Sequence, residues 1–326
     1  MPPAPDPTLC DTILEVHDLS VDYASPHGRM RAVDRVSLSI RRGETLGLVG
    51  ESGCGKSTLG RAILRLVELS AGTIRLAGTD VTGLSRAALR PLRRSAQMVF
   101  QDPLASLDPR WTVGRLVAEP LVIHGLGSRP ERQARVRDLL DRVGLPAEAV
   151  GRFPHEMSGG QRQRVGIARA LALAPQLLIL DEAVSALDVS VQAQVLNVLA
   201  DLQAELGLAY LFISHDLAVV DHVADRVAVM LGGRLVETGP RARLAGNPLH
   251  PYTQELLGAV PGHRDHSRGR QEAREAGDDE VRPGGEGGCP FVPRCTLATG
   301  QCRAEAPPLR AAGSGSLACH HVALAA

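Results

Sequence analysis

The sequence predicts an α/β fold in which helices connect the strands of a mostly parallel sheet. Short apolar runs at residues 45–49 and 177–180 have the composition of buried strands, and stretches with helical periodicity alternate with them. A glycine-rich turn follows the first of these runs and leads into a helical stretch, as expected of a crossover connection. The 326 residues suffice for one large domain with appendages, and 44% hydrophobic with 22% charged residues exclude a fully disordered chain.

The first part of the chain contains the elements nearest the glycine-rich turn. Residues 1–10 are rich in proline and are predicted to form a disordered tail. A globular domain is predicted over residues 11–262, in which residues 13–21 and 36–40 are expected to be strands. Residues 56–68 are expected to form a helix, because four apolar side chains fall on one of its faces: Leu59, Ile63, Leu66 and Val67.

The alternation of strands and helices continues along this domain. An amphipathic helix is predicted at residues 131–143, ending near Gly144. Residues 192–206 are predicted to be helical and to connect two buried strands, at 177–180 and 209–213. A strand, a helix and a further strand in this order favour parallel pairing of the two strands.

The C-terminal part of the chain changes in composition. Residues 263–288 contain 12 Asp, Glu or Arg and no Leu, Ile, Phe or Met, so a charged, mobile linker without a core is predicted there. Residues 289–326 hold four of the six cysteines and are predicted to form a small cysteine-rich extension.

The composition argues against nucleic acid as a partner. Lys+Arg and Asp+Glu are equal at 36 each and aromatic residues make up only 2%, so the chain has neither a basic excess nor stacking platforms. No apolar run reaches the ~18–20 residues of a membrane-spanning helix, and the N-terminus has no signal-peptide pattern. The chain is therefore expected on the cytoplasmic side, with cysteines that are thiols or metal ligands.

Lys56 is the only lysine of the chain, and every other basic residue counted with it is arginine. In a chain with this bias, a retained lysine indicates a place that needs a compact ammonium group. The alternative is chance survival of one lysine, which its surroundings in the sequence argue against.

Residues 50–58 fit the pattern G-x-x-x-x-G-K-[ST] between a predicted strand and a predicted helix, the context of a phosphate-binding loop. The glycines let backbone N–H groups point at phosphate oxygens, and the helix N-terminus adds positive potential. Lys56 is expected to reach the β- and γ-phosphates of ATP and Ser57 to ligate Mg²⁺, whereas Cys54 is interpreted as a tolerated small residue. The alternative is an accidental glycine-rich turn. The candidate ATP-binding residues are Gly50, Glu51, Ser52, Gly53, Cys54, Gly55, Lys56, Ser57 and Thr58.

Two acidic residues follow the apolar run at 177–180. Asp181 is expected to hold Mg²⁺, directly or through water, and Glu182 to orient and polarise the attacking water. Two solvated acids after a strand would give the same pattern. The phosphate-binding loop upstream is what favours a functional role for Asp181 and Glu182.

Further segments complete an order of motifs that resembles the ABC-type ATPases. The letters MSGGQRQR at 157–164 resemble the signature motif of that family, with Met157 where Leu is usual. Gln101, within VFQDP, matches the glutamine loop of the family. The letters SALD at 185–188 match its D-loop, and His215 matches its switch histidine.

The resemblance covers residues 13–262 and implies an ABC-type nucleotide-binding domain. That domain consists of a P-loop NTPase core with a parallel sheet, an antiparallel β-subdomain and a helical insert, here at about residues 103–160. Tyr23 stands where an aromatic side chain commonly stacks on adenine in the family, with ordinary packing as the alternative.

The same resemblance implies how the residues act. Two nucleotide-binding domains dock head to tail, and each ATP lies between the phosphate-binding loop of one and the signature motif of the other. Gln101 is expected to touch Mg²⁺ or the water, and His215 to bridge the γ-phosphate and position the water of Glu182. Ala183 and Val184 replace the usual Pro-Thr, but competent hydrolysis is predicted because the residues expected to contact phosphate are present. The residues implied at the interface are Ser158, Gly159, Gly160, Gln161 and Asp188.

A narrower resemblance is to the ATP-binding subunits of oligopeptide and dipeptide permeases, on FQDPLASLDPR at 100–110 and HPYTQELL at 250–257. It implies a peripheral subunit at the cytoplasmic face of the membrane that hydrolyses ATP to drive peptide import. The implied partners are a second ATPase subunit (expected to be a different chain), two membrane permease subunits and an external substrate-binding protein. Import of nickel or another small solute is the alternative cargo. A soluble non-transport ABC ATPase and a redox-sensing regulatory module are the alternative functions.

Cys289, Cys295, Cys302 and Cys319 are separated by five, six and 16 residues, which is not the Cys-x2-Cys spacing of zinc ribbons. The segment CPFVPRC resembles the C-terminal extension of the peptide-permease ATPases, where four cysteines are associated with a 4Fe–4S cluster. Four thiolates suit that cluster and suit Zn²⁺ as well, and free thiols remain a further alternative. His320 and His321 are alternative ligands or a solvated pair.

Overall fold

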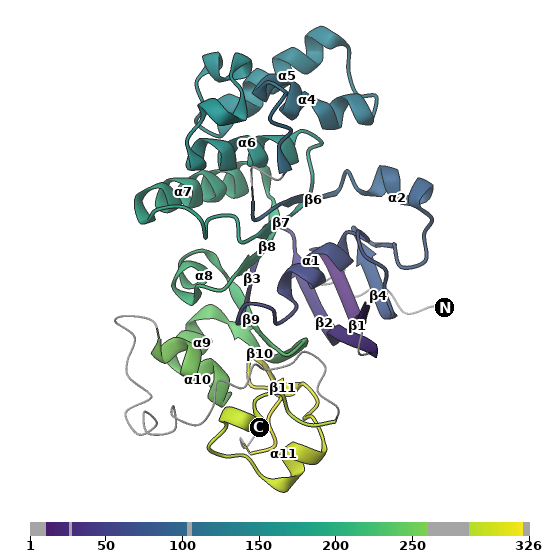
Figure 1. Ribbon diagram of the computed structural model, residues 1–326, viewed down its shortest axis with the longest axis vertical. Coiled ribbons are helices and arrows are strands. Elements are labelled where there is room, and N and C mark those ends of the chain that lie inside the picture. Colours follow the sequence, from purple (N-terminus) through teal and green to yellow (C-terminus); the bar gives the residue numbers. More distant parts are fainter. Residues whose placement is uncertain (1–10, 26–27, 103–105, 260–286, 322–326) are drawn as a thin grey trace. The chain divides into compact units, whose positions relative to one another are not determined.

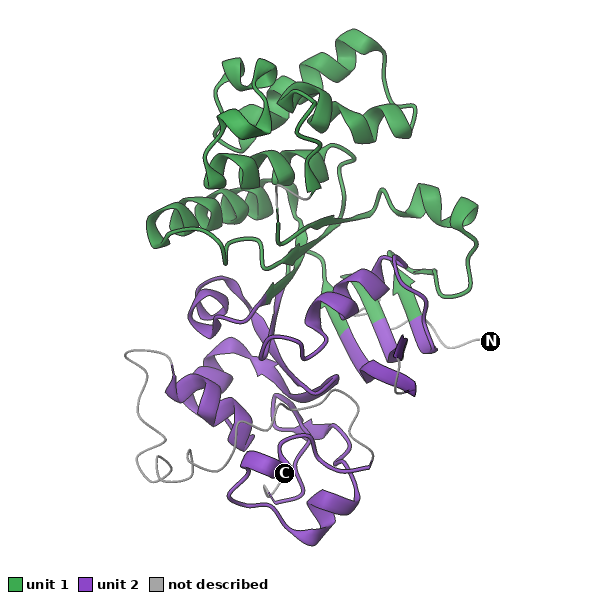
Figure 2. Ribbon diagram, viewed as in Figure 1, with its two compact units in different colours: residues 1–15, 39–44, 74–213 green, residues 16–38, 45–73, 214–326 purple. Residues whose placement is uncertain are grey.

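The computed structural model describes residues 11–25, 28–102, 106–259 and 287–321 (Figure 1). The predicted tail at 1–10, most of the predicted linker at 263–288 and residues 103–105 of the helical insert lie outside the described residues. The chain divides into two compact units (Figure 2). Unit 1 comprises residues 1–15, 39–44 and 74–213, and unit 2 comprises residues 16–38, 45–73 and 214–326.

Unit 1 contains the predicted parallel strands. Strands β8 (Ala209–Ser214), β7 (Leu177–Asp181) and β6 (Ala96–Val99) are neighbours in this order and pair in parallel. Every residue of β7 is buried, as expected for a strand covered on both faces. The predictions of strands at 177–180 and 209–213 are confirmed, each with one residue added at its end.

The helices of unit 1 follow local signals in the sequence. Helix α5 (Arg129–Arg142) begins with a capping box formed by Ser128 and Glu131, and Gly144 takes a left-handed φ of 67° just beyond its end. Helix α7 (Val189–Leu206) begins three residues before the prediction because Asp188 caps it. In Figure 1, α4 lies against α5 and α6. The remaining helical segments are α2 (Arg86–Leu92), α4 (Val113–Ile123), η2 (Ala147–Gly151), η3 (Pro154–Glu156) and α6 (Gly159–Leu171).

Unit 2 contains a strand series in the order β11-β12-β10-β9-β3. Strand β3 (Thr45–Val49) is parallel to β9 (Arg226–Leu231), and β9 is antiparallel to β10 (Arg234–Pro240). Strands β11 (Arg310–Ala312) and β12 (Gly315–Leu317) belong to the cysteine-rich extension, and β12 pairs with β10. Two strands of the extension therefore belong to this sheet. The helical segments are α1 (Lys56–Ile63), α8 (Leu217–Val223), α9 (Arg241–Gly246), α10 (Pro251–Gly258), η5 (Val292–Arg294) and α11 (Gly300–Ala304).

A second sheet of four strands has the order β2-β1-β4-β5. Strands β4 and β5 pair in an antiparallel manner. The strands predicted at 13–21 and 36–40 lie within β1 and β2 and are confirmed, although both elements are longer than predicted. The bounds are β1 (Thr12–Ser25), β2 (Gly28–Arg41), β4 (Ala71–Leu76) and β5 (Thr79–Asp80).

The prediction of a helix over residues 56–68 is wrong beyond Ile63, where α1 ends. Arg65 adopts a left-handed φ of 53°, and its N–H donates to the carbonyl oxygen of Ala62 at 2.9 Å. The N–H of Leu66 reaches back to Arg61 O at 2.9 Å, which closes the helix end in the manner of a left-handed cap. Leu66 is consequently 47% exposed instead of lying on the predicted apolar face.

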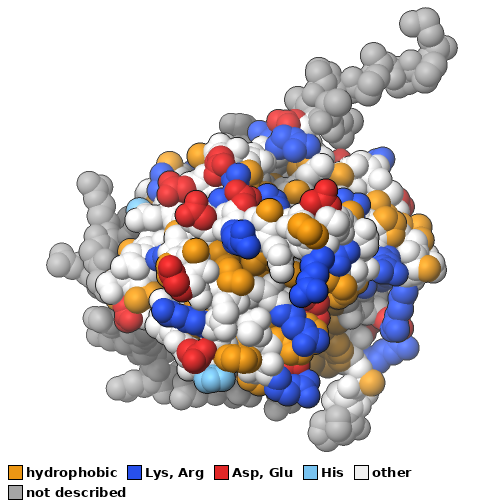
Figure 3. Space-filling model, turned by 90° about the horizontal axis from the view of Figure 1, so that it is seen from above, with side chains coloured by type: hydrophobic (Ala, Val, Ile, Leu, Met, Phe, Trp, Pro, Cys, Tyr) orange, Lys and Arg blue, Asp and Glu red, His pale blue; other side chains and the backbone are white. Residues whose placement is uncertain are grey.

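The face of the molecule in Figure 3 carries basic and acidic side chains with hydrophobic ones between them. This mixture agrees with the equal numbers of basic and acidic residues in the chain. Across the described ranges, no helix combines the length and the apolar character that crossing a bilayer requires.

Candidate nucleotide-binding site

The predicted phosphate-binding loop lies in unit 2, between β3 and α1, as the sequence predicts. Two of its glycines are required by their surroundings. A Cβ on Gly50 would stand 2.1 Å from Met230 O, and a Cβ on Gly55 would stand 2.2 Å from Ala32 O. Both glycines also have positive φ, at 156° and 106°, so a side chain at either position is excluded by space and by backbone conformation.

The ammonium group of Lys56 is held inside this loop. The residue is 4% exposed, and Nζ donates to Gly50 O at 2.7 Å and to Glu51 O at 2.8 Å. Cys54 Sγ lies 3.8 Å from the same nitrogen. Charged phosphate oxygens are stronger acceptors than these carbonyl oxygens, so a phosphate bound in the loop can replace them as the acceptor of the Lys56 ammonium group.

The other loop residues provide a partly open surface. Ser52 and Gly53 are exposed, whereas Ser57 and Thr58 are half-buried. Burial raises the pKa of the Cys54 thiol, which therefore stays protonated at neutral pH, as expected of a packed small residue. Tyr23 is half-buried on β1 and also belongs to unit 2.

The two predicted acids lie in unit 1, at the carboxyl end of β7. Asp181 is 1% exposed and is the register partner of Ile213 on β8. Glu182 has a left-handed φ of 47°, which is uncommon for a residue with a side chain, and its N–H donates to Ile213 O at 3.0 Å. Because of this turn, the Glu182 side chain does not continue the alternation of side chains between the two faces of β7.

Gln101 and Glu182 are brought together in unit 1. Gln101 follows β6 by two residues, and its Nε2 donates to Glu182 Oε2 at 2.9 Å. Because β6 and β7 are parallel neighbours, their carboxyl ends meet at the same edge of the sheet. Together with Gly159, these two side chains line a cleft of about 150 Å³. An amide and a carboxylate at the edge of a small cleft can hold a water molecule or a metal ion between them.

The predicted signature segment begins helix α6. The Ser158 hydroxyl accepts from the N–H of Gln161 at 3.3 Å, and the Gln161 side-chain oxygen accepts from the N–H of Ser158 at 3.0 Å. This is a capping box, so the exposed serine is fixed at the helix start. A Cβ on Gly160 would stand 2.2 Å from Val191 Cγ1, so the glycine lets α6 approach α7 closely.

The predicted D-loop aspartate and switch histidine each lie on the C-terminal side of a strand of the sheet. The Asp188 carboxylate accepts from the N–H of Val191 at 3.0 Å and from the Ser190 hydroxyl at 2.8 Å, and these hydrogen bonds lower the pKa of Asp188. His215 is exposed, follows β8 directly and falls in unit 2. The next residue, Asp216, caps α8.

Among the four cysteines of the extension, Cys289 contacts Cys302 through the backbone and is influenced by the charges of the other three. Its N–H donates to Cys302 O at 2.8 Å. Burial raises the pKa of the Cys289 thiol, and the charges of Cys302, Cys295 and Cys319 raise it further. In the described part of the chain, no three His, Cys, Asp or Glu side chains are already arranged to hold one metal ion.

The two histidines of the extension differ in their contacts. His321 Nε2 lies 3.1 Å from Cys302 Sγ and 3.1 Å from Thr299 Oγ1. His320 Nε2 lies 3.1 Å from Glu305 O. Of the pair, His321 is therefore the one beside a cysteine.

Two residues that the sequence left without a role contact the phosphate-binding loop. The hydroxyl of Tyr252 accepts from the N–H of Glu51 at 3.0 Å, and Arg294 Nη1 lies 2.6 Å from Glu51 Oε1. Tyr252 and Arg294 belong to the segments HPYTQELL and CPFVPRC, which the sequence marked only by resemblance. No local pattern links them to Glu51, because 201 and 243 positions separate the partners.

Two family models match separate parts of the chain, and similar proteins cover most of its length. The family model described as "ABC transporter" matches residues 33–185, and the one described as "Oligopeptide/dipeptide transporter, C-terminal region" matches residues 236–302. A protein of Brucella abortus whose name describes a peptide import ATP-binding protein is 53% identical over 317 residues, which cover 95% of this chain and 94% of that protein. The di/tripeptide transport ATP-binding protein DppF of Pseudomonas aeruginosa is 47% identical over 318 residues, covering 95% and 98%.

Solved structures give the same result for the fold. The dimeric, post-hydrolysis structure of the ATP-binding cassette MJ0796, bound to ADP and Pi, aligns with a TM-score of 0.65 and 28% sequence identity. The alignment covers 70% of this chain and 99% of that one.

Proposed function

The chain belongs to the ABC transporter family, and from this premise we propose that it is the ATP-hydrolysing subunit of an importer that carries peptides across the cytoplasmic membrane. The observation that carries the activity is the hydrogen bond of 2.9 Å between Gln101 and Glu182, at the ends of two parallel strands. The match of residues 236–302 to the oligopeptide/dipeptide region supports peptides as the cargo.

In this proposal, each residue predicted from the sequence has one task. Lys56 binds the β- and γ-phosphates, and the backbone N–H groups of residues 50–58 surround them. Ser57, Asp181 and Gln101 hold Mg²⁺, which supplies positive charge to the phosphate oxygens when it is bound. Glu182 orients and polarises the attacking water, and His215 bridges this water and the γ-phosphate. Tyr23 stacks on the adenine ring.

A second ATPase subunit completes the site. Ser158 and the Gly159–Gly160 backbone donate to the γ-phosphate bound by the partner, and Gln161 and Asp188 belong to the interface with the partner domain. The exposed Ser158 at a helix start and the 83% exposed Val189 beside Asp188 support an interface there. The related cassette bound to ADP and Pi is itself a dimer. We take the second subunit to be a different chain.

The membrane permease subunits dock, in this proposal, on a cleft of about 240 Å³ in unit 1. The cleft is lined by residues of β6, α4 and α6, and it includes Phe100, which precedes Gln101. Phe100 and Ile123 are 39% and 52% exposed, so apolar surface is open to a partner. The chain then acts as a peripheral subunit at the cytoplasmic face, with two permease subunits and an external substrate-binding protein that selects the cargo.

Uptake of labelled peptide tests this proposal. Cells carrying Glu182→Gln are expected to lose uptake of a labelled tripeptide nearly completely, because closure without hydrolysis does not cycle the transporter. Uptake of labelled nickel, measured in parallel, is expected to be the same with wild type and variant. Loss of nickel uptake alone would move the cargo to a small solute, and unchanged uptake of both would contradict the importer.

We propose further that residues 11–262 form the ATPase domain, that 263–288 link it to the extension at 289–326, and that Cys289, Cys295, Cys302 and Cys319 hold a 4Fe–4S cluster. The donor set fits, because four cysteine sulfurs are the usual ligands of this cluster, and bound iron would relieve the repulsion that the charges of Cys295, Cys302 and Cys319 exert on a Cys289 thiolate. The cluster would hold the extension together and take no part in hydrolysis. The thiols must move from their positions in this structure to bind it.

Metal analysis of the full-length chain, purified without oxygen, tests the cluster. About four iron and four sulfide per chain are expected. Cys289→Ser should lose the iron, whereas Cys54→Ser, which replaces a cysteine outside the extension, should keep it. Zinc in place of iron, or no metal with reactive thiols, would overturn the assignment.

A further inference from the structure

Arg294 lies in the extension and contacts the beginning of the phosphate-binding loop. It ends the short helical segment η5, and its Nη1 lies 2.6 Å from Glu51 Oε1 and 3.4 Å from Glu255 Oε1. The guanidinium carbon stands 5.5 Å from the ring centre of Tyr252 and 5.3 Å from that of Phe291. Nε and Nη2 of Arg294 are buried and have no hydrogen-bond partner. The carboxylates of Glu51 and Glu255 and two aromatic faces therefore hold this cation.

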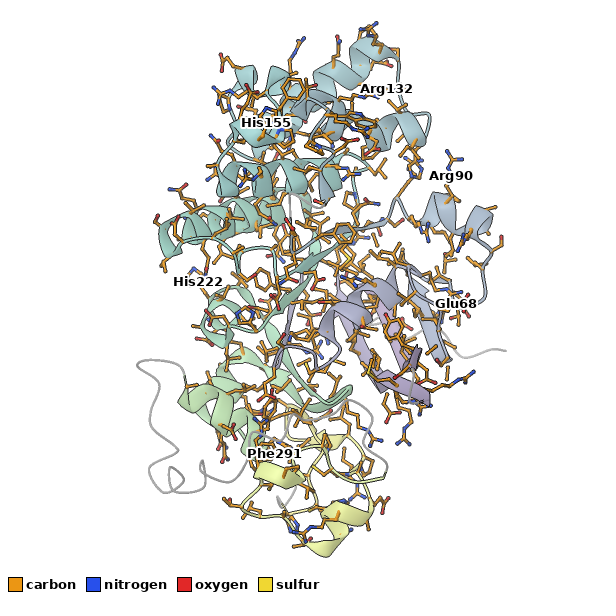
Figure 4. All side chains as sticks on the ribbon, in the orientation of Figure 1. Glu68, Arg90, Arg132, His155, His222 and Phe291 are labelled. Atoms are coloured by element: carbon orange, nitrogen blue, oxygen red, sulfur yellow. The ribbon has the colours of Figure 1, made fainter. Side chains whose placement is uncertain are left out.

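Tyr252 contacts the backbone of the same loop residue. The side chain is fully buried, and its hydroxyl accepts from the N–H of Glu51 at 3.0 Å. Its ring packs against Phe291, labelled in Figure 4, with 5.6 Å between the ring centres. Glu51 is thus held by its backbone through Tyr252 and by its carboxylate through Arg294.

A series of buried and partly buried hydrogen bonds supports these contacts. Glu237 of β10 is 0% exposed and accepts from the N–H groups of Leu249 and His250 at 3.0 and 2.9 Å. His250 Nδ1 in turn accepts from the N–H of Tyr252 at 3.1 Å. Burial lowers the pKa of His250 to about 4, so the ring is neutral and can accept at physiological pH. Glu237 is also the register partner of Leu317 on β12, which ties this support to the extension.

The charges indicate what the contact does. Glu51 places a carboxylate inside a loop that is otherwise built to receive phosphates, and an uncompensated carboxylate there repels them. Arg294, which Glu51 shares with Glu255, places a positive charge beside this carboxylate, and the arginine side chain is 28% exposed, so water screens the pair incompletely. The benefit grows with the negative charge of the ligand and is larger for ATP than for ADP.

We propose that Arg294 and Tyr252 are positioning residues of the phosphate-binding loop, through which the C-terminal extension sets the affinity for nucleoside triphosphates. This inference rests on the proposed binding of ATP by residues 50–58. Arg294 immediately precedes Cys295, so whatever holds the four cysteines together also holds the arginine against Glu51.

A double-mutant cycle on the full-length chain tests the charge argument, with fluorescent ATP and ADP analogues as probes. Arg294→Gln is expected to weaken ATP binding about fivefold and ADP binding less. In a Glu51→Gln background, the same replacement should change the Kd by less than about twofold, because the carboxylate is gone. Arg294→Lys should keep part of the wild-type affinity. The matched control is Arg303→Gln, at an exposed arginine of the same extension.

An equal loss of affinity from Arg294→Gln in both backgrounds would show that the arginine is merely structural, and no loss would remove its role altogether. Thermal unfolding of each variant separates loss of fold from loss of affinity.

Tyr252→Phe keeps the ring and removes the hydroxyl acceptor, so it should weaken the binding of ATP and of ADP equally. An unchanged Kd would remove Tyr252 from the proposal. Lys56→Ala distinguishes failure of the proposed ATP-binding loop from failure of the proposed role of Arg294. If it binds ATP normally, the proposed nucleotide loop itself fails; if it alone loses ATP while Arg294→Gln does not, only the present inference fails.

Discussion

Replacing Glu182 by Gln is expected to lower the rate of ATP hydrolysis by about 10²–10⁴-fold while leaving ATP binding largely intact. The amide keeps the size of the side chain and can still pair with Gln101, whose Nε2 now donates to the carboxylate at 2.9 Å. The amide cannot accept a proton from the attacking water, and it lacks the negative charge that polarises this water. The effect is therefore confined to kcat, and the Kd for ATP should change by no more than about twofold.

The measurement is steady-state phosphate release, combined with equilibrium binding of a fluorescent ATP analogue. Glu148→Gln is the matched control, because Glu148 is an exposed glutamate of the same unit and lies in η2. Wild-type turnover in Glu182→Gln would assign the polarising role to another residue. A loss of binding as large as the loss of turnover would instead show that Glu182 holds the nucleotide or the metal.

The sequence predicted the elements whose cause is local. Strand β3 has the predicted bounds, because a short apolar run before a glycine turn can form little else. The helix predicted at residues 131–143 corresponds to α5, which begins two residues earlier through the capping box of Ser128. The loop at 50–58 could be recognised because its glycines, lysine and serine are contiguous.

The parts that the sequence did not predict either lack a local signal in the sequence or depend on contacts between distant positions. The end of α1 at Ile63 is set by the left-handed conformation of Arg65. No glycine or proline at this position signals the helix end in the sequence. The hydrogen bond between Gln101 and Glu182 depends on the parallel pairing of β6 with β7, across 81 positions. The motifs named both residues, but only the fold brings their side chains into contact.

Replacing Lys56 by Ala is expected to weaken MgATP binding by about 100-fold or more, since two or more charge-assisted hydrogen bonds to phosphate are lost. Lys56→Arg should not restore binding. The site around Nζ is formed by Gly50 O, Glu51 O and Cys54 Sγ at 2.7, 2.8 and 3.8 Å, which suits a compact ammonium and not a planar guanidinium. Arg61→Ala, at an exposed position of the same helix, is the matched control for binding.

The absence of any other lysine permits a second measurement on the unmodified protein. An amine-reactive reagent can label only Lys56 and the N-terminal amine, so mass spectrometry reads the accessibility of one side chain. Labelling should be slow, because Lys56 is 4% exposed, and MgATP should slow it further while leaving the N-terminal amine unaffected. Equal labelling of Lys56 with and without saturating MgATP would contradict its contact with the phosphates. The binding assay changes the Lys56 side chain, whereas the labelling experiment leaves it in place. The two experiments therefore test the contact with phosphate independently.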